Sequence, residues 1–135
     1  MDVVIFPDIE QLLVNHLSVA LPQRGYNITV HTQIPGTRPE SFVTVPRVGG
    51  PRRNQVVDSA TISVDSWAIR PKPAHDLAQM VRGLIGALPG QMLDGYPIYR
   101  VTEFTGPGNM PDPRSQHARY TQAFSILVRG YAAAE

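Results

Sequence analysis

The stretch QVVDSATISVDSWAIRPKPAHDLAQMVRGLIGAL, residues 55–88, combines a strand pattern with a helix pattern. Apolar residues in its first part alternate with polar ones, as in a strand that buries one face: Ala60, Ile62, Val64 and Ala68. Apolar residues in its second part recur at helical spacing and form one stripe: Leu77, Met80, Val81, Leu84, Ile85 and Leu88. The stretch therefore predicts a long strand over residues 55–69 and an amphipathic helix over residues 71–88.

The same two patterns place further elements on both sides of this stretch. A helical stripe of apolar residues predicts a first helix over residues 7–21. Alternation and β-branched residues predict strands over residues 27–34 and 42–48 before the central stretch, and over residues 96–104 and 117–129 after it. The predicted order of helices and strands is therefore α-β-β-β-α-β-β.

The strands and the helices each present one apolar surface, and this decides how they pack. Consecutive strands joined by short turns are expected to pair antiparallel. The sequence therefore predicts an α+β fold in two layers, a mostly antiparallel sheet of about five strands with two helices on one face. One domain is expected over residues 1–131, with a frayed tail over residues 132–135. The proline- and glycine-rich segment at residues 106–113 is expected to be a stiff, non-helical loop.

The composition excludes several classes of protein. The chain has 135 residues and a formal net charge of +1, so it lacks the strongly basic balance of many nucleic-acid-binding proteins. It has no cysteine, which excludes disulfides, thiolate catalysis and cysteine-ligated metal sites. No apolar run approaches the ~20 residues of a membrane span. Residues 1–6 lack the features of a signal peptide, so a soluble intracellular protein is expected.

No constellation in the sequence predicts catalysis or a bound cofactor. The histidines are far apart along the chain and none has metal-ligand spacing: His16, His31, His75 and His117. The sequence contains no nucleophile elbow, and no glycine-rich phosphate loop precedes a helix. Asp58 and Asp65 are predicted to lie on opposite faces of the long strand, which is poor geometry for an acid and base pair. We therefore expect no enzyme activity, no catalytic residue, no cofactor and no metal.

The arginines around Gly49-Gly50 form the only basic cluster of the sequence: Arg47, Arg52 and Arg53. Three interpretations of this cluster stay open at this point. The arginines bind phosphate through their bidentate guanidinium groups, they form a solvated hairpin tip, or they belong to an arm that docks on an acidic patch of another subunit.

Trp67 is the second candidate for a binding role. It is predicted to lie on the polar face of the long strand, where an indole has no obvious function. Either its own chain caps it, or a partner buries it as an interface anchor. In the second case, Trp67→Ala is expected to weaken assembly more than it lowers the stability of the monomer.

A series of short motifs gives the chain a family resemblance through its order and spacing. The series begins with Pro46-Arg47-Val48-Gly49-Gly50-Pro51-Arg52-Arg53, Asp58-x-Ala60, Val64-Asp65-Ser66-Trp67-Ala68 and the amphipathic helix that contains Leu77. It continues with Gly95-Tyr96-Pro97-Ile98-Tyr99-Arg100-Val101-Thr102-Glu103, Gly106-Pro107, Pro111-Asp112-Pro113, Arg119-Tyr120 and Arg129-Gly130. Over residues 9–130, the chain resembles the tail terminator, or tail-completion, proteins of bacteriophages with long non-contractile tails, particularly those that infect actinobacteria. The predicted α-β-β-β-α-β-β order matches the fold of that family.

The resemblance implies a structural role in a virion, without catalysis. Proteins of this family form a hexameric ring of identical subunits on the head-proximal end of the tail tube and are assembled in the host cytoplasm. The resemblance implies that the major tail tube protein and a head-tail connector protein are partners, and possibly the tape-measure protein. Genome DNA passes through the lumen of the ring without specific binding, and no membrane is involved. A net charge near zero suits such a lumen, because a strongly basic wall would hold moving DNA.

As a hypothesis, seven residues contact a subunit or a partner: Arg47, Arg52, Arg53, Trp67, Asp112, Arg114 and Arg119. Two alternatives stay open beside the tail terminator. The first is another neck protein of such a particle, a head-closure or connector-adaptor protein. The second is a nucleic-acid-binding module that uses the arginine cluster.

Overall fold

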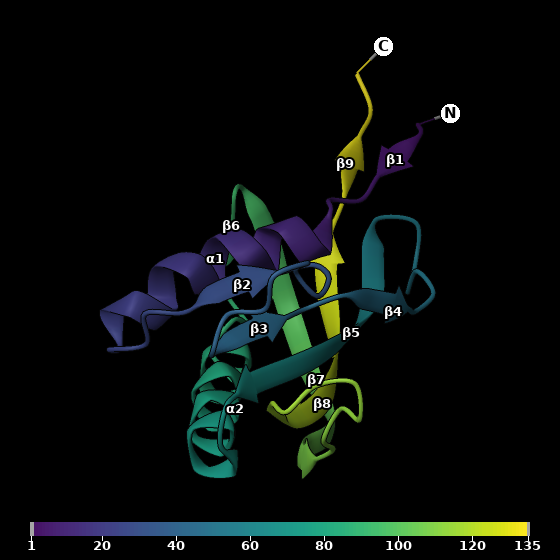
Figure 1. Cartoon of the computed structure of the whole chain (residues 1–135). Helices are drawn as coiled ribbons and strands as arrows, with labels where there is room; N and C mark the ends of the chain where they lie inside the picture. The colour runs from purple at the N-terminus through teal and green to yellow at the C-terminus, as the bar shows by residue number, and fades with distance from the viewer. Residues whose placement is uncertain (1, 135) are drawn as a thin grey trace.

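The computed structural model describes residues 2–134, and Figure 1 shows their arrangement. In chain order, the elements are β1 (Val4–Ile5), α1 (Ile9–Gln23), β2 (Thr29–His31), β3 (Phe42–Thr44), β4 (Arg47–Gly49), β5 (Val57–Ala68), α2 (Pro71–Gly86), β6 (Met92–Leu93), β7 (Tyr96–Asn109), β8 (Ala118–Arg129) and β9 (Tyr131–Ala132). A seven-stranded sheet has the order β2-β3-β5-β8-β7-β6, with β4 also paired to β5. β1 and β9 form a separate two-stranded sheet.

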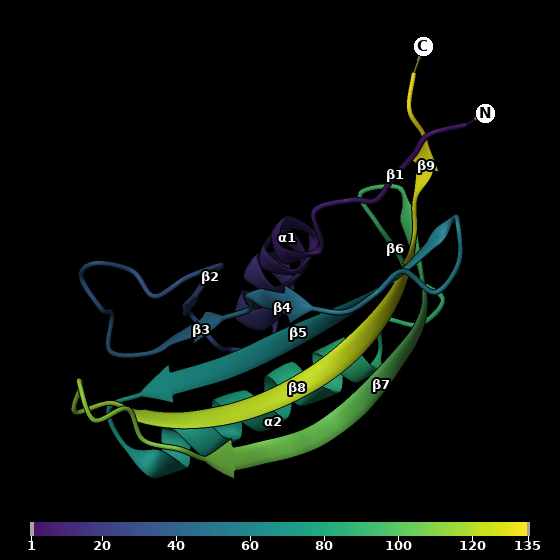
Figure 2. The ribbon, with the colours of Figure 1, turned by 90° about the vertical axis from the view of Figure 1, so that its right-hand side faces the viewer.

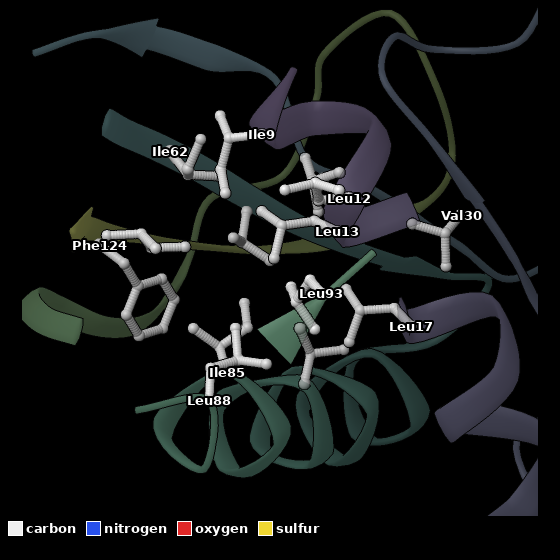
Figure 3. Close-up of a cluster of buried hydrophobic side chains, with 14 of the residues drawn as sticks. Ile9, Leu12, Leu13, Leu17, Val30, Ile62, Ile85, Leu88, Leu93 and Phe124 are labelled. Atoms are coloured by element: carbon white, nitrogen blue, oxygen red, sulfur yellow. The ribbon is translucent and has the colours of Figure 1, made fainter. Parts of the chain in front are cut away.

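Both helices pack on one face of the large sheet. One hydrophobic cluster joins α1, α2 and the strands, and Figure 3 shows Leu13 and Leu17 of α1 with Ile62, Ile85 and Phe124. The predicted α+β class, with two helices and a mostly antiparallel sheet, is confirmed. Local sequence explains most of this packing, because Leu77, Val81 and Ile85 of the predicted stripe are buried, and Ala74 and Ala78 are buried beside them.

The other side of the sheet is covered by neither helix, and we call it the helix-free face. Figure 2 views this side, with β5, β8 and β7 in front of α2. Its strand residues alternate with those of the core and are mostly half-buried or exposed: Ser59, Thr61, Ser63, Asp65 and Trp67 of β5, Arg100, Thr102 and Thr105 of β7, and Arg119, Thr121, Ala123, Ser125, Leu127 and Arg129 of β8. The opposite faces predicted for Asp58 and Asp65 are confirmed.

Two predictions about strands are wrong. β2 pairs parallel with β3, with Thr29 opposite Phe42, whereas antiparallel pairing was expected. The connection over residues 32–41 is long enough to carry the chain back across the sheet edge before β3 begins. The predicted loop at residues 106–113 is also shorter than expected, because β7 continues to Asn109 and pairs there with Tyr120 of β8.

The two ends of the chain lie side by side and project beyond the body of the domain (Figures 1 and 2). β9 pairs antiparallel with β1, and the N–H of Ala133 donates to the carbonyl of Val3 at 2.7 Å. The expectation of a frayed tail is therefore wrong for residues 132 and 133, while Glu135 lies outside the described residues. We call the β1–β9 pair the terminal arm. A Cβ atom at Gly130 would lie 2.6 Å from the Phe6 ring, so the close crossing at the base of the arm requires glycine.

Candidate interaction surfaces

The residues that the resemblance suggests for an interface gather at the two ends of β5. Arg52 and Arg53 lie near its first residue, and Arg47, which pairs with Ile62, reaches Asp58 there with its guanidinium. Trp67 lies near the last residue of β5, beside the segment that carries the other candidates. A strand rises about 3.3 Å per residue, so the ends of β5 are at most about 36 Å apart. The candidates therefore form two separate groups, an arginine group at the start of β5 and a group around Trp67 at its end.

Trp67 is capped by its own chain. Its side chain is fully buried, stacks on Phe42 with 5.2 Å between ring centroids, and donates from its indole N–H to the hydroxyl of Thr44 at 3.3 Å. The guanidinium groups of Arg38 and Arg119 lie 5.4 and 5.1 Å from the centroid of the indole. Of the two alternatives for Trp67 the first is confirmed, and its role as an interface anchor is wrong. We call these five residues the tryptophan cluster.

Asp112 holds a loop against the tryptophan cluster. Its carboxylate accepts hydrogen bonds from the backbone N–H of Arg114 at 2.9 Å and from the guanidinium of Arg38 at 3.1 Å. These two hydrogen bonds, the backbone one first, lower the pKa of Asp112 below its usual value. Asp112 is buried and acts within its own chain, whereas the side chain of Arg114 is 89% exposed. Of this group, Arg114 is therefore the residue best placed to meet a partner.

Arg47 is also used within the chain. Its guanidinium donates to the two carboxylate oxygens of Asp58 at 2.5 and 3.1 Å, and to the carbonyls of Gly49 and Gly50 at 3.0 Å each. Gly50 has a φ of +97°, and a Cβ atom there would lie 2.1 Å from the carbonyl oxygen of Ser59. The turn therefore requires glycine and closes around Arg47. These contacts bind Arg47 to its own chain, and a contact of Arg47 with a partner stays a prediction.

Arg52 and Arg53 stay at the surface. Both are exposed, and the guanidinium of Arg52 lies 5.6 Å from the centroid of the Phe6 ring at the base of the terminal arm. Neither forms an ion pair among the described residues. For these two residues, the interpretations as a phosphate clamp, a solvated tip or a subunit contact all remain open.

Two further surfaces were not identified from the sequence. The outer edge of β7 has no strand partner beyond Pro97 in the described chain, and its side chains include exposed Tyr99 and Phe104. The terminal arm exposes two more apolar residues, Ile5 and Tyr131, and Val3 is exposed just before it. A long unpaired edge with apolar side chains favours pairing with another chain. The alternation in residues 96–104 indicates a strand but carries no information on whether that strand lies at an edge.

The described residues do not gather the groups that a metal site needs. No set of three histidine, aspartate or glutamate side chains among residues 2–134 could hold a metal ion. The Nδ1 atom of His117 shares a hydrogen bond with the hydroxyl of Ser115, and its Nε2 atom lies 2.7 Å from the carbonyl oxygen of Pro39. His117 therefore fixes a loop beside the tryptophan cluster. Neither helix of residues 2–134 is long and apolar enough to cross a membrane.

Asp65 is a half-buried carboxylate on the helix-free face. Its Oδ1 atom has no hydrogen-bond partner among the described residues. Burial raises the pKa of Asp65 above its usual value, and a hydrogen bond with Thr121 and the charge of Arg119 oppose this only in part. The ionised form of Asp65 is therefore less favourable in the folded protein than in the unfolded chain.

Asp65→Asn is expected to stabilise the protein at neutral pH. Because the folded state raises the pKa of Asp65, wild-type stability falls as the pH rises from about 4, the ordinary aspartate value, through the raised value. The variant lacks this fall, so its advantage in urea unfolding is expected to be smallest in acid and largest at pH 7. Glu40→Gln, in an exposed loop, controls for the loss of one negative charge. An advantage that grows on acidification would show that Arg119 favours the ionised carboxylate.

No model of a known protein family matches the chain, and no curated protein sequence matches it. The resemblance to tail terminator proteins stays a prediction that rests on the residues quoted for it.

Proposed function

We propose that this protein is a structural virion protein that forms a hexameric ring on the head-proximal end of a phage tail tube. The ring stops polymerisation of the tube and provides the surface on which head and tail join. Its partners are other copies of itself, the major tail tube protein and a head-tail connector protein, and it makes or breaks no covalent bond. The order and spacing of the quoted motifs support this proposal, as does an element order compatible with that family.

The observation that carries the proposal is a pair of different unsatisfied surfaces on one chain. The unpaired edge of β7 exposes Tyr99 and Phe104, and the terminal arm, built from both ends of the chain, projects beyond the sheet with Ile5 and Tyr131 exposed (Figure 2). A ring needs this kind of interface, in which each subunit contributes two different patches and the rotation closes. An isolated two-stranded ribbon is only marginally stable, so the arm gains most when it packs on a neighbour.

Light scattering after size-exclusion chromatography tests the proposal. We expect a hexamer, or a monomer that becomes hexameric when purified tail tubes are added. The proposal is contradicted if the protein stays monomeric at all concentrations, with and without tail tubes. Negative-stain images of labelled protein separate the proposal from its alternative, since a tail terminator lies at the tube end and a head-closure or connector-adaptor protein lies at the portal.

Phe104→Asp is expected to weaken assembly about tenfold or more, because an apolar contact residue is replaced by a charge that must be desolvated. The stability of the monomer is expected to change little, since Phe104 is 59% exposed. The assembly constant is measured by sedimentation velocity over a concentration series. Val19→Asp, on the outer surface of α1 and 62% exposed, is the matched control. Equal assembly of Phe104→Asp and wild type would exclude the β7 edge from the interface.

A further inference from the structure

The charged side chains of the strands are divided unequally between the two faces of the sheet. The helix-free face carries Arg100, Arg119 and Arg129, and none of the three forms an ion pair among the described residues. The strand carboxylates Asp58 and Glu103 lie on the helix side, where each binds an arginine. Among residues 2–134, Asp65 is the one carboxylate on the strands of the helix-free face. A net charge of +1 thus conceals a positive face.

One end of this face is built as a hollow with two guanidinium groups. Arg53, Asn54, Tyr99 and Arg100 line its rim, Val57 and Leu127 complete its lining, and its volume is about 300 Å³. Asn54 is held in place because its Oδ1 atom accepts from the backbone N–H groups of residues 56 and 57, at 2.9 Å each. Its amide nitrogen remains as a donor. Arg129 lies next to the hollow, opposite Val57 in the register of β5 and β8. Guanidinium and amide donors around one hollow suit a phosphate group.

The other end of the face has a guanidinium that is already oriented. The Nε atom of Arg119 donates to the carbonyl of Met110 at 2.8 Å, and its guanidinium lies over the indole of Trp67. Its two terminal nitrogens donate no hydrogen bond to the described residues. Arg119 and Arg129 are ten positions apart on one strand, which is at most about 33 Å and close to one turn of a B-form duplex.

The middle of the face carries small hydroxyl side chains: Ser59, Thr61, Ser63, Thr102, Thr105, Thr121 and Ser125. In the described chain, no exposed large apolar side chain lies among them. A stable interface with an acidic protein partner would need an exposed apolar anchor, and the large apolar side chain that lies here, Leu127, is half-buried. Arginine and hydroxyl side chains are the groups that contact DNA phosphates without recognising sequence. The charges and the chemistry of the face therefore favour DNA over protein.

We propose that the helix-free face contacts the phosphate backbone of double-stranded DNA without sequence preference, with the Arg53–Arg100 hollow and Arg119 at its two ends. This inference goes beyond the proposed function, because it concerns the isolated chain and does not require a ring. Each chain contacts few phosphates, so binding is weak and falls steeply with salt. Such a weakly binding face slides along DNA, whereas a strongly basic surface would hold the DNA in place.

Fluorescence anisotropy with a labelled duplex of about 20 base pairs, two helical turns, tests the proposal. We expect binding at low salt, with a slope of log K against log salt between about −2 and −4. In the double variant Arg53→Gln/Arg100→Gln, we expect affinity to fall at least about tenfold and the slope to lose about 1–2 in magnitude, since each phosphate contact contributes about 0.9. A duplex with a scrambled sequence is expected to bind with the same affinity.

The matched control is Arg24→Gln/Arg70→Gln, which removes the same charge from exposed arginines outside this face. If both double variants lose affinity equally, net charge alone explains the binding and the proposal is overturned. No binding of the duplex at low salt also overturns it, as does tighter binding of polyglutamate, which would indicate an acidic protein partner. The single variant Arg129→Gln repeats the test if the double variant does not fold. Ring assembly on tail tubes is measured separately, so loss of DNA binding and failure of the proposed function are distinguishable.

Discussion

Replacing Trp67 with alanine is expected to lower the free energy of unfolding by about 3–5 kcal/mol, the usual cost of deleting a large buried aromatic side chain. Trp67 is fully buried, and its removal would leave a cavity against Phe42. It would also leave the hydroxyl of Thr44 without a partner and the guanidinium groups of Arg38 and Arg119 without the ring they lie on. Urea unfolding followed by circular dichroism measures the effect, because Trp67 is the only tryptophan and the variant has no indole fluorescence.

Trp67→Phe is the matched variant, since phenylalanine keeps a ring over Phe42 and loses only part of the volume. We expect it to cost less than half as much as the alanine variant. This expectation reverses the one that follows from burial by a partner, in which assembly suffers more than stability. A Trp67→Ala protein that unfolds like wild type but no longer assembles would return Trp67 to the interface.

The sequence was sufficient to predict the elements in which the hydrophobic pattern repeats many times without interruption. The alternation around Ile62 and the stripe through Leu77 and Ile85 fix which face of β5 and α2 is buried, because each pattern repeats over several turns or residue pairs. β2 is different. It has three residues, and the direction in which so short a strand pairs is decided by the path of the chain between residues 32 and 41. Periodicity carries no information on that path.

The candidate surfaces could be predicted only in part, for a related reason. Alternation correctly placed Trp67 on the face opposite the core, but what covers it comes from Phe42, Arg38 and Arg119, which are distant in sequence. Likewise, the cluster of arginines around Gly49-Gly50 was visible, while the pairing of Arg47 with Asp58 depends on how β4 folds back on β5. A sequence shows charges, and only the register of strands shows which charges neutralise each other.

Replacing Arg47 with methionine is expected to lower the free energy of unfolding by about 3 kcal/mol, at the lower end of the range for a broken buried ion pair. The Asp58 side chain is only 5% exposed and would be left without the guanidinium that binds it. The carbonyls of Gly49 and Gly50 would lose their donor as well. We expect a loss at the lower end of that range because the Arg47 side chain is 29% exposed, so water reaches part of the site. Urea unfolding at neutral pH measures it.

The double variant Arg47→Met/Asp58→Leu distinguishes the ion pair from simple packing. Most of the loss in the single variant comes from an unpaired buried carboxylate, so removing that carboxylate as well is expected to restore most of the stability. If the double variant is less stable than Arg47→Met alone, the packing of the turn around the guanidinium matters more than its charge. If Arg47→Met unfolds like wild type, the pair contributes nothing, and Arg47 becomes available again as a contact for a neighbouring subunit.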